Sequence, residues 1–440
     1  MTTNPSRLGS ATEFPAARHY GWFALGFLAF AVYGSLVPFD FRPVPLSEAF
    51  SRYRAAWLIP VRVVSRSDWL SNILLFIPAG FLLSGWLAVD RPRRSLLVAA
   101  CVIPLVSVAL SSAIEFAQVY FPTRTVSLRD VVAETIGGSL GGCLWLAFGR
   151  RLTAKARARA DGGSSRAAWL LPAYLLALLL SRVMPLDLTI SPGELHGKYK
   201  AGMIAVRPFA ALASNPVAAV GRLADEASSF LVAGLLLGRA AGLRPSGGRL
   251  VFAFGLAIAG SVEVAQLFVA SRRFDSTDVI VGSLAVLGGW AAARATLGEP
   301  DPRRTGRARL ALLVGWLGLA VASSWSPFDF EVAPKNWSSK ASAISPLPFV
   351  DYYRGSVWVA ADQIFRKATL FFPLGMVLGR GPRVTFLAAT GLAIFLEFGQ
   401  FALPARVPSL TDVVVEMGGA WAGLLCAGRR LPGDGVGGVL

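Results

Sequence analysis

The chain has 440 residues, of which 54% are hydrophobic and 16% are charged, and its mean hydropathy is +0.55. That balance excludes an ordinary soluble protein and indicates a chain that lies in a bilayer. Its formal net charge is +17, but the lysines and arginines form short clusters between apolar runs. Such clusters are typical of membrane-protein loops, and no compact basic domain is present to bind nucleic acid.

Cysteine and histidine are too scarce and too scattered to build a metal centre. Cys101, Cys143 and Cys426 lie singly in apolar runs, which predicts small buried residues and neither disulfides nor a metal site. His19 and His196 are the two histidines of the sequence, which argues against a histidine-based zinc or iron centre. We therefore expect neither a metal nor a cofactor.

Apolar runs of roughly 17–25 residues, long enough to cross a bilayer, fall into three sets of four. They are Tyr20–Val37, Leu70–Val89, Ser95–Phe121 and Leu128–Phe148, then Ala168–Met184, Ala227–Ala241, Leu250–Ala270 and Thr277–Ala293, then Leu310–Ser324, Phe365–Leu378, Val384–Leu403 and Leu410–Cys426. This pattern predicts an all-α integral membrane protein with about twelve transmembrane helices in three tandem four-helix repeats. The second helices of the later sets carry the weakest apolar signal.

The repeats define the expected domains. We place them at residues 20–150, 167–296 and 308–428, after a polar N-terminal segment at 1–19 and before a C-terminal tail at 429–440. The first apolar run has no clear small-residue cleavage site, so we expect a retained membrane helix and not a removed signal peptide.

A polar motif recurs at the end of the third helix of each set. A glutamate is followed three residues later by glutamine, nine by arginine, twelve by serine or aspartate, and fifteen by aspartate. The three copies are Glu115, Gln118, Arg124, Ser127 and Asp130, then Glu263, Gln266, Arg272, Asp275 and Asp278, then Glu397, Gln400, Arg406, Ser409 and Asp412. Chance does not repeat four polar positions at one spacing in three apolar segments, so the sequence indicates an internal triplication.

The first helix of each set also ends alike, in Pro38-Phe39-Asp40-Phe41, Pro185-Leu186-Asp187-Leu188 or Pro327-Phe328-Asp329-Phe330. In the first set an apolar stripe then follows at helical spacing, made by Leu46, Phe50, Tyr53 and Trp57. It predicts a helix that either lies in the membrane interface or packs on the protein as a lid. Two glycine spacings, Gly138-x-x-x-Gly142 and Gly419-x-x-x-Gly423, favour close helix packing.

The basic loops set the expected orientation. Residues 150–166 and 294–309 join the sets and are rich in arginine, as is the short loop at 91–94. With four spans in each set, these loops fall on one side, which the positive-inside rule makes cytoplasmic. Both termini are then cytoplasmic, and the repeated polar residues converge on the extracytoplasmic face.

Each polar residue has a structural interpretation beside a functional one. Glu115 lies about 10 Å from its helix end, where a carboxylate needs a partner, and Arg124 is the natural counter-ion, either to pin the turn or to build a site. Asp130 follows Ser127 as the acid of a capping box, which does not prevent it from lining a site. Asp40 could merely end its helix, and Asn72 could be a helix-start residue or a ligand-binding group.

Together, each set offers two or three carboxylates, an amide and one arginine. An arginine beside acids suits a phosphate or carboxylate head group. Glu115 and Asp130 could act as acid and base if burial tunes one of them. The sequence shows no nucleophile motif and no phosphate-binding loop, so an enzyme would have residues but no assigned reaction.

The motif series resembles the VanZ-like family. It comprises Pro-Phe-Asp-Phe, Asn72 with Phe76-Ile77-Pro78-x-Gly80, Glu-x-x-Gln, the arginine, and Ser-x-x-Asp-Val-Val. Members are bacterial membrane domains of four to five helices, named for a protein linked to teicoplanin resistance, and their molecular activity is not established. The resemblance covers nearly the whole chain and implies a multi-pass protein of the bacterial plasma membrane connected with the cell envelope.

The first set matches the motifs of the VanZ-like family best, and the second and third sets depart from them. Glu226 and Lys367 stand where the first set has Asn72, and Pro78 has no equivalent in the second set. Where the family often has asparagine, four residues past the last aspartate, this chain has Glu134, Gly282 and Glu416. These departures place the second set in doubt first as a working site.

We therefore expect a VanZ-like membrane protein that binds an envelope lipid or glycopeptide-like head group, such as a polyprenyl-linked or glycolipid one, with glycopeptide resistance implied by the resemblance. The alternatives are an enzyme acting on a lipid-linked substrate, a transporter and a structural scaffold. The candidate binding residues are Asp40, Asn72, Glu115, Gln118, Arg124, Asp130, Glu263, Gln266, Arg272, Asp278, Glu397, Gln400, Arg406 and Asp412, of which Glu115 and Asp130 are also the candidate catalytic residues.

Overall fold

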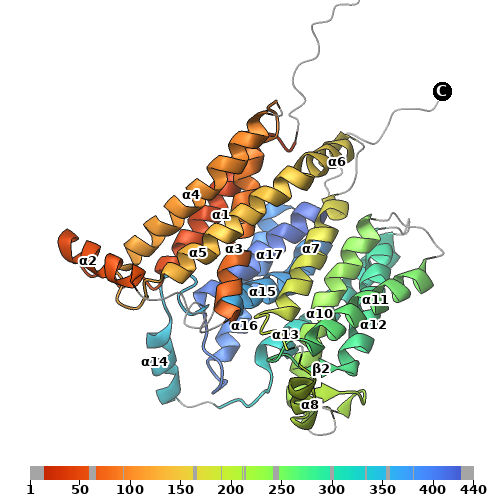
Figure 1. Ribbon diagram of the computed structural model, residues 1–440. Coiled ribbons are helices and arrows are strands. Elements are labelled where there is room, and N and C mark those ends of the chain that lie inside the picture. Colours follow the sequence, from red (N-terminus) through yellow and green to blue (C-terminus); the bar gives the residue numbers. More distant parts are fainter. Residues whose placement is uncertain are drawn as a thin grey trace, which may run out of the picture. The chain divides into compact units, whose positions relative to one another are not determined.

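The computed structural model is all-helical apart from two short strands (Figure 1). The structure describes residues 14–58, 66–92, 94–161, 166–189, 191–210, 212, 215–240, 247–297, 302–331, 334–352, 357–379 and 381–427. The expected tail at 429–440 and most of the N-terminal segment therefore lie outside the described residues.

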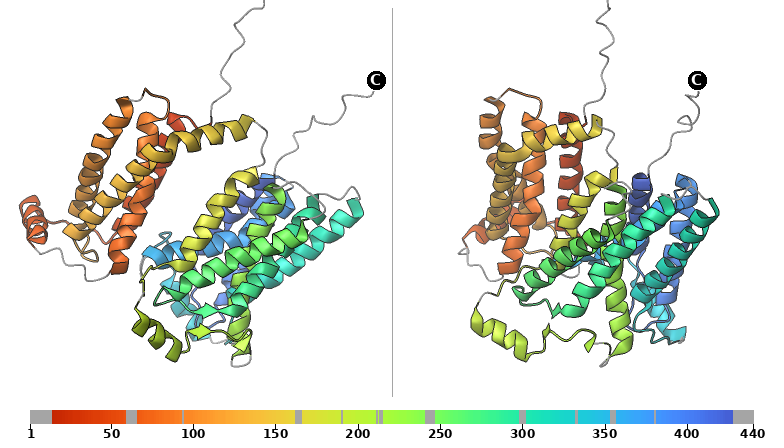
Figure 2. Two further views of the ribbon diagram at one scale, coloured as in Figure 1. Left: turned by 45° about the vertical axis from the view of Figure 1, so that its right-hand side comes forward. Right: turned by 90° about the vertical axis from the view of Figure 1, so that its right-hand side faces the viewer.

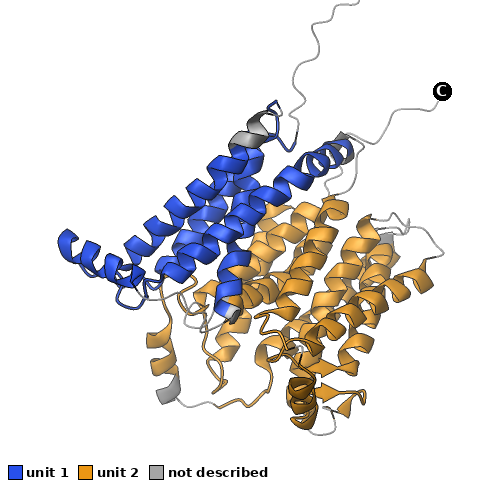
Figure 3. Cartoon of the chain, in the orientation of Figure 1, with its two compact units in different colours: residues 1–164 blue, residues 165–440 orange. Residues whose placement is uncertain are grey.

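The chain divides into two compact units, residues 1–164 and residues 165–440 (Figure 3). Unit 1 holds the first of the three expected sets. Unit 2 holds the second and third sets, which pack on each other through α10, α12, α13 and α15.

Unit 1 contains every helix expected of the first set and the helix expected in its connection. Its elements are α1 (Ala17–Leu36), α2 (Leu46–Trp57), α3 (Arg66–Ala88), α4 (Arg94–Gln118), α5 (Leu128–Leu144), a π-helical turn at Trp145–Gly149 and the basic α6 (Arg150–Asp161). The fourth apolar run thus continues through the π turn into α6.

Unit 2 contains two further series of helices. The first comprises α7 (Arg166–Val183), α8 (Pro192–Lys200), β1 (Ile204–Ala205), α10 (Pro216–Ala240), α11 (Gly248–Leu267), β2 (Phe274–Asp275) and α12 (Ser276–Leu297). The second comprises α13 (Pro302–Trp325), α14 (Pro334–Ala343), α15 (Val357–Leu378), α16 (Pro382–Gln400) and α17 (Leu410–Ala427). In both views of Figure 2 the green helices α10, α11 and α12 run side by side, and the parallel pair β1–β2 joins the connection to the turn before α12.

Nine helical segments of the described chain are long and apolar enough to cross a membrane: α3, α4, α5 with its continuation into α6, α7, α11, α12, α13, α16 and α17. The helices α1, α10 and α15 are not among them. The sequence placed the starts of α10 and α15 too late, near Ala227 and Phe365, whereas they begin at Pro216 and Val357. Charged residues in the N-terminal halves of both helices hide these halves from an apolar pattern, and Arg222, Asp225 and Arg366 among them are paired inside the protein.

Glycines let the second and fourth helices of each set approach most closely. A Cβ on Gly80 would lie 1.9 Å from the carbonyl oxygen of Gly138, and a Cβ on Gly375 would lie 1.8 Å from that of Ala420. Backbones this close admit only hydrogen at the contact, as in small-residue helix interfaces. The expected spacing at Gly419 and Gly423 is confirmed as a packing face.

In α5 the packing register differs from the expected one by a single residue. Gly137 and Gly141 face α3, where an added Cβ would lie 2.1 and 2.0 Å from carbonyl oxygens. Gly138 instead faces the hydroxyl of Ser107 on α4, and Gly142 has ordinary van der Waals room. Consecutive glycines therefore serve two different neighbouring helices.

The turns after α1, α7 and α13 have one backbone form. The peptide before each proline is cis, and the next residue has a positive φ: 64° at Phe39, 60° at Leu186 and 62° at Phe328. The chain then bonds to the segment after the third helix of its own set, as between Arg42 N and the Tyr120 carbonyl at 2.8 Å. This pairing brings the end of the first helix to the polar motif.

The helix predicted between the first two spans is present as α2. Phe50 and Tyr53 pack on the ring of Phe116 in α4, with ring centroids 5.0 and 5.6 Å apart, while Leu46 and Trp57 stay 60% and 44% exposed. One face thus contacts the protein and the other remains apolar and open, so α2 has features of both expected roles.

The cysteine prediction is correct for one residue of three. Cys426 is buried, but Cys101 and Cys143 are exposed on α4 and α5. A thiol is apolar enough to face lipid, so an apolar run alone does not distinguish a buried position from a lipid-facing one.

Candidate functional site

The glutamate of the repeated motif makes the same contact in all three sets. Its carboxylate accepts a hydrogen bond from the backbone N–H twelve residues later, which closes the turn between the third and fourth helices. The oxygen–nitrogen distances are 2.6 Å for Glu115 and Ser127, 2.8 Å for Glu263 and Asp275, and 2.7 Å for Glu397 and Ser409. All three glutamates are buried, so each of these contacts is shielded from water.

The motif arginine bonds to the end of the first helix. Its guanidinium donates to backbone carbonyls there: Arg124 to Gly34 at 2.8 Å, Arg272 to Ser181 at 2.9 Å, and Arg406 to Ser326 at 3.0 Å. The expected ion pair between motif glutamate and motif arginine is absent from the described residues in all three sets. The last carbonyls of a helix lack N–H partners within the helix, and the motif arginine donates hydrogen bonds to them instead.

The motif glutamine acts in two ways. Gln118 and Gln266 donate to the carbonyls of Ser35 and Arg182, each at 3.2 Å. Gln400 instead donates to the carboxylate of Glu397 at 2.6 Å, which is the contact expected from their spacing.

The capping prediction is confirmed for the first residue of the box but not for the acid. Ser127 is the N-cap residue that precedes α5, and its hydroxyl accepts from the backbone N–H of Arg129 at 3.2 Å. In a full capping box the acid three residues later accepts from the N–H of the cap residue. Here Glu115 already takes the N–H of Ser127, so Asp130 is available to bond elsewhere.

The aspartate of each motif instead meets a donor from the second helix. Asp130 accepts from the amide of Asn72 on α3 at 2.7 Å. Asp278 accepts from Arg222 of α10 at 2.9 Å, and Asp412 pairs with Lys367 of α15. The sequence aligned Asn72 with Glu226 in the second set and thus missed Arg222, which lies one turn earlier on the same helix.

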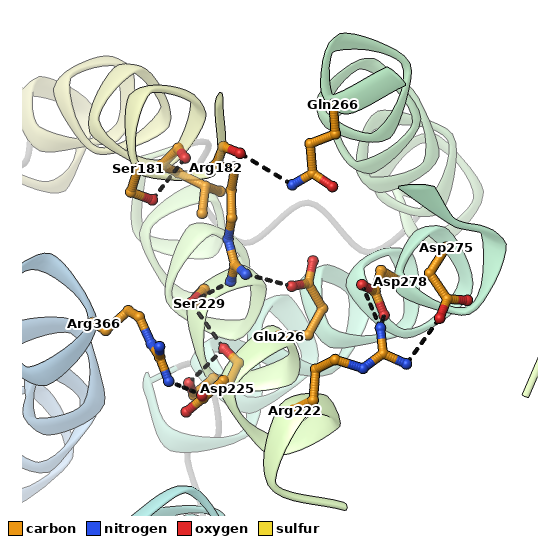
Figure 4. Close-up of polar contacts among 12 residues, drawn as sticks. Ser181, Arg182, Arg222, Asp225, Glu226, Ser229, Gln266, Asp275, Asp278 and Arg366 are labelled. Atoms are coloured by element: carbon orange, nitrogen blue, oxygen red, sulfur yellow. Dashed lines mark hydrogen bonds and ion pairs between the residues drawn. The ribbon is translucent and has the colours of Figure 1, made fainter. Parts of the chain in front are cut away.

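In the second set, arginines satisfy the acids within the protein (Figure 4). Arg182 pairs with Glu226 at 2.7 Å and donates to Ser229 at 3.0 Å. Arg222 lies between Asp275 and Asp278, at 2.9 Å from each.

In the third set, one lysine contacts three carboxylates. The Nζ of Lys367 pairs with Asp412 and lies 3.4 Å from Glu397 and 3.3 Å from Glu416. Tyr352, from the connection before α15, donates its hydroxyl to Asp412. Burial and the charge of Asp412 raise the pKa of Tyr352, so the hydroxyl keeps its proton and remains a donor.

A further polar contact joins the second and third sets. Asp225 of α10 accepts from Arg366 of α15 and from Ser323 of α13. Neither Asp225 nor Arg366 belongs to the repeated motif, so the repeat pattern could not identify them. Their charges were the available signal, since both residues lie at the start of apolar runs in the sequence.

A polar cavity of about 300 Å³ opens beside these contacts in unit 2. The motif residues of the third set on its wall are Gln400, Arg406, Ser409 and Asp412, together with Lys367. Gln363, Arg366 and Asp225 line it as well. Five positions singled out by the sequence therefore share one cavity.

The aspartates that end the first helices lie apart from these clusters. Asp40 is exposed and pairs with Arg42 at 3.7 Å, and Asp329 is exposed. Asp187 accepts hydrogen bonds from the backbone and hydroxyl of Ser271. The contacts of Asp187 with Ser271 fit an aspartate that organises the turn after the first helix.

Comparison with known proteins gives a family. The model of the VanZ/LLP1 family matches residues 17–149 and again residues 310–430, which together are more than half of the chain. The matched stretches hold the first and third sets, and the second lies outside them. No curated protein and no solved structure matches the chain. The two matches, on the stretches that carry the same glutamate and arginine contacts, show that the chain belongs to the VanZ-like family.

Proposed function

We propose that this VanZ-like protein binds the head group of an envelope lipid in the polar cavity of unit 2. The observation that carries the proposal is the cavity itself, because its wall combines charges of both signs with amides and hydroxyls. Arg366, Lys367 and Arg406 would meet a phosphate, and Asp225 and Gln363 would meet hydroxyl groups of a sugar.

The two cavity arginines have donors to spare. A guanidinium carries five N–H groups. Among the described residues, Arg406 uses one hydrogen bond to Ser326, and Arg366 bonds to Asp225. The remaining donors can reach a phosphate without breaking the contacts that hold the helices.

The proposed architecture is three tandem four-helix repeats with twelve spans. Its support is the glutamate-to-backbone and arginine-to-carbonyl contacts, which recur in each set. The basic α6 follows the fourth helix of the first set, and the basic start of α13 opens the first helix of the third set. Each is therefore separated from the nearest motif turn by one helix length. By the positive-inside rule the termini are cytoplasmic, the motif turns and the cavity face outward, and the membrane is the bacterial plasma membrane.

The rival functions make different measurable predictions. An enzyme acting on a lipid-linked substrate would show turnover that Glu397→Gln abolishes, and a transporter would give flux across vesicles containing this protein alone. The contacts of Glu397 and Asp412 with Lys367 favour binding over acid–base chemistry, because both carboxylates are already engaged. A part in glycopeptide resistance is supported by family membership and would follow if the bound head group belonged to an envelope precursor or to the antibiotic.

Native mass spectrometry of the purified full chain tests the binding proposal. We expect a polyprenyl-phosphate or glycolipid to remain bound to wild type. Arg366→Gln should reduce its occupancy about tenfold, since losing one charge-assisted hydrogen bond costs about 1.5 kcal/mol. Arg383→Gln is the matched control, because Arg383 is exposed at the start of α16 and lies outside the cavity wall. Equal retention of bulk phospholipid alone by all three proteins would contradict the proposal.

A further inference from the structure

Unit 1 carries the same three carboxylates that surround Lys367 in unit 2. Glu115, Asp130 and Glu134 occupy the motif positions of Glu397, Asp412 and Glu416, in stretches that match one family model. Glu115 and Glu134 are 2% and 5% exposed, and Asp130 and Glu134 both lie close enough to repel Glu115 electrostatically. We call these three acids the unit 1 acidic cluster.

The described residues of unit 1 place no cation at the centre of the corresponding cluster. Asn72 stands at the position of Lys367 and offers a neutral amide, which donates to Asp130 at 2.7 Å. Among the described residues, no lysine or arginine makes an ion pair with Glu115, Asp130 or Glu134. Arg129 acts on Asp130 from a distance, and Asp68 opposes it with negative charge.

One buried carboxylate oxygen at this cluster also lacks a hydrogen-bond partner among the described residues. The Oε2 atom of Glu134 accepts no hydrogen bond from any residue that the structure describes. The fully buried hydroxyl of Ser111 on α4 lies next to Glu134. Buried polar atoms are nearly always satisfied in folded proteins, and several uncompensated buried carboxylates are costly. The pattern is that of a site built around a positively charged group.

We propose that the unit 1 acidic cluster binds the primary ammonium group of a ligand, in the place that the Nζ of Lys367 fills in unit 2. A primary ammonium has three N–H donors for three carboxylates, as Lys367 shows with Glu397, Asp412 and Glu416. Asn72 and Asp130 are only half-buried, so the cluster can be reached from their end. The ligand class is an amine-bearing head group, such as that of an aminophospholipid.

This proposal rests on the correspondence of residues 17–149 with residues 310–430, and it is independent of the cavity in unit 2. Its site lies wholly in unit 1. If the cavity in unit 2 bound no head group, the ammonium proposal for unit 1 would be unaffected. If unit 1 bound no ammonium group, the cavity proposal would likewise be unaffected.

Thermal unfolding of the detergent-solubilised full chain with three salts tests it. Ethylammonium chloride should raise Tm saturably by about 2 °C or more, since a ligand that binds only the folded state stabilises it. Tetramethylammonium chloride at equal ionic strength should not, because it has no N–H donor. A saturable rise with magnesium chloride in place of ethylammonium would overturn the ammonium assignment in favour of a metal ion.

Variants locate the effect. Asn72→Lys supplies the ammonium internally, as in unit 2, and should abolish the ethylammonium response, whereas Asn72→Gln should retain it. Glu134→Gln provides a second test if Asn72→Lys does not fold, and should reduce the response at least several-fold. A response that persists unchanged in Asn72→Lys or in Glu134→Gln, or no response in wild type, would refute the site. Nanodiscs of phosphatidylethanolamine and of phosphatidylcholine then separate a lipid source from a free amine, with stabilisation expected in the former.

Discussion

Replacing Lys367 by methionine should destabilise the protein by about 3–5 kcal/mol, the usual cost of removing one partner from a buried charge cluster. The ammonium lies against Asp412, Glu397 and Glu416, and Glu416 is fully buried. Without it, three carboxylates share a desolvated space, and their remaining described donors are Tyr352, Gln400 and the backbone N–H of Ser409. Unfolding in sodium dodecyl sulfate, followed by circular dichroism, measures the loss.

A double-mutant cycle separates this charge effect from lost packing. In the Lys367→Met background, Glu416→Gln should recover at least about 1 kcal/mol, because it removes one of the unpaired charges. Lys155→Met serves as control, since Lys155 is an exposed residue of α6. A loss below about 1 kcal/mol for Lys367→Met, with no coupling to Glu416, would show that the lysine is not the counter-ion of this cluster.

Adding one methyl group at Gly419 should destabilise the protein by about 3 kcal/mol, at the upper end of what overpacking a core costs. The new Cβ would lie 2.0 Å from the carbonyl oxygen of Ala368, so α15 and α17 would have to separate. The backbone cannot rotate away as a flexible side chain could.

The adjacent glycine is the matched control. A Cβ on Gly418 meets no atom within 4 Å. Gly418→Ala should therefore leave stability unchanged or raise it by up to about 1 kcal/mol, because alanine favours a helix more than glycine does. The same unfolding assay should give the two neighbours effects of opposite sign. Equal effects at both positions would mean that α15 and α17 do not pack through Gly419.

The sequence predicted the helices well because membrane spans are long apolar runs. It failed at the starts of α10 and α15, where charged residues interrupt the apolar pattern. Asp225 of α10 pairs with Arg366 of α15, and the two residues are 141 positions apart in the chain. A hydropathy scale counts each charged residue against a membrane span, and it contains no information on whether a distant segment supplies an oppositely charged partner.

The repeated spacing correctly singled out residues that lie together, but it did not reveal their partners. Glu397 bonds to the backbone N–H of Ser409, and Arg406 bonds to a carbonyl of the first helix. Backbone groups carry no identity in a sequence, so side-chain reasoning paired the glutamate with the arginine instead. Lys367 departs from the asparagine of the first set, and the structure explains it as the counter-ion of the third set's carboxylates.

These contacts also explain how a binding cavity can lie beside an intact helix bundle. Glutamate and arginine hold the turn before the fourth helix to the end of the first helix in each set. Because backbone groups satisfy most of this framework, the side chains between the second and fourth helices can vary. They are an amide in the first set, an arginine in the second and a lysine in the third.

Cysteine accessibility in intact spheroplasts tests the central claim that the polar cavity faces outward. In a background in which Cys101, Cys143 and Cys426 are replaced by serine, Val407→Cys samples the cavity wall, where Val407 is 53% exposed. Gly306→Cys samples the basic start of α13, where no atom would crowd the new side chain. An impermeant maleimide added from outside should label position 407 at once and position 306 only after lysis. Labelling of 306 in intact spheroplasts with 407 protected until lysis would place the cavity in the cytoplasm and contradict the account.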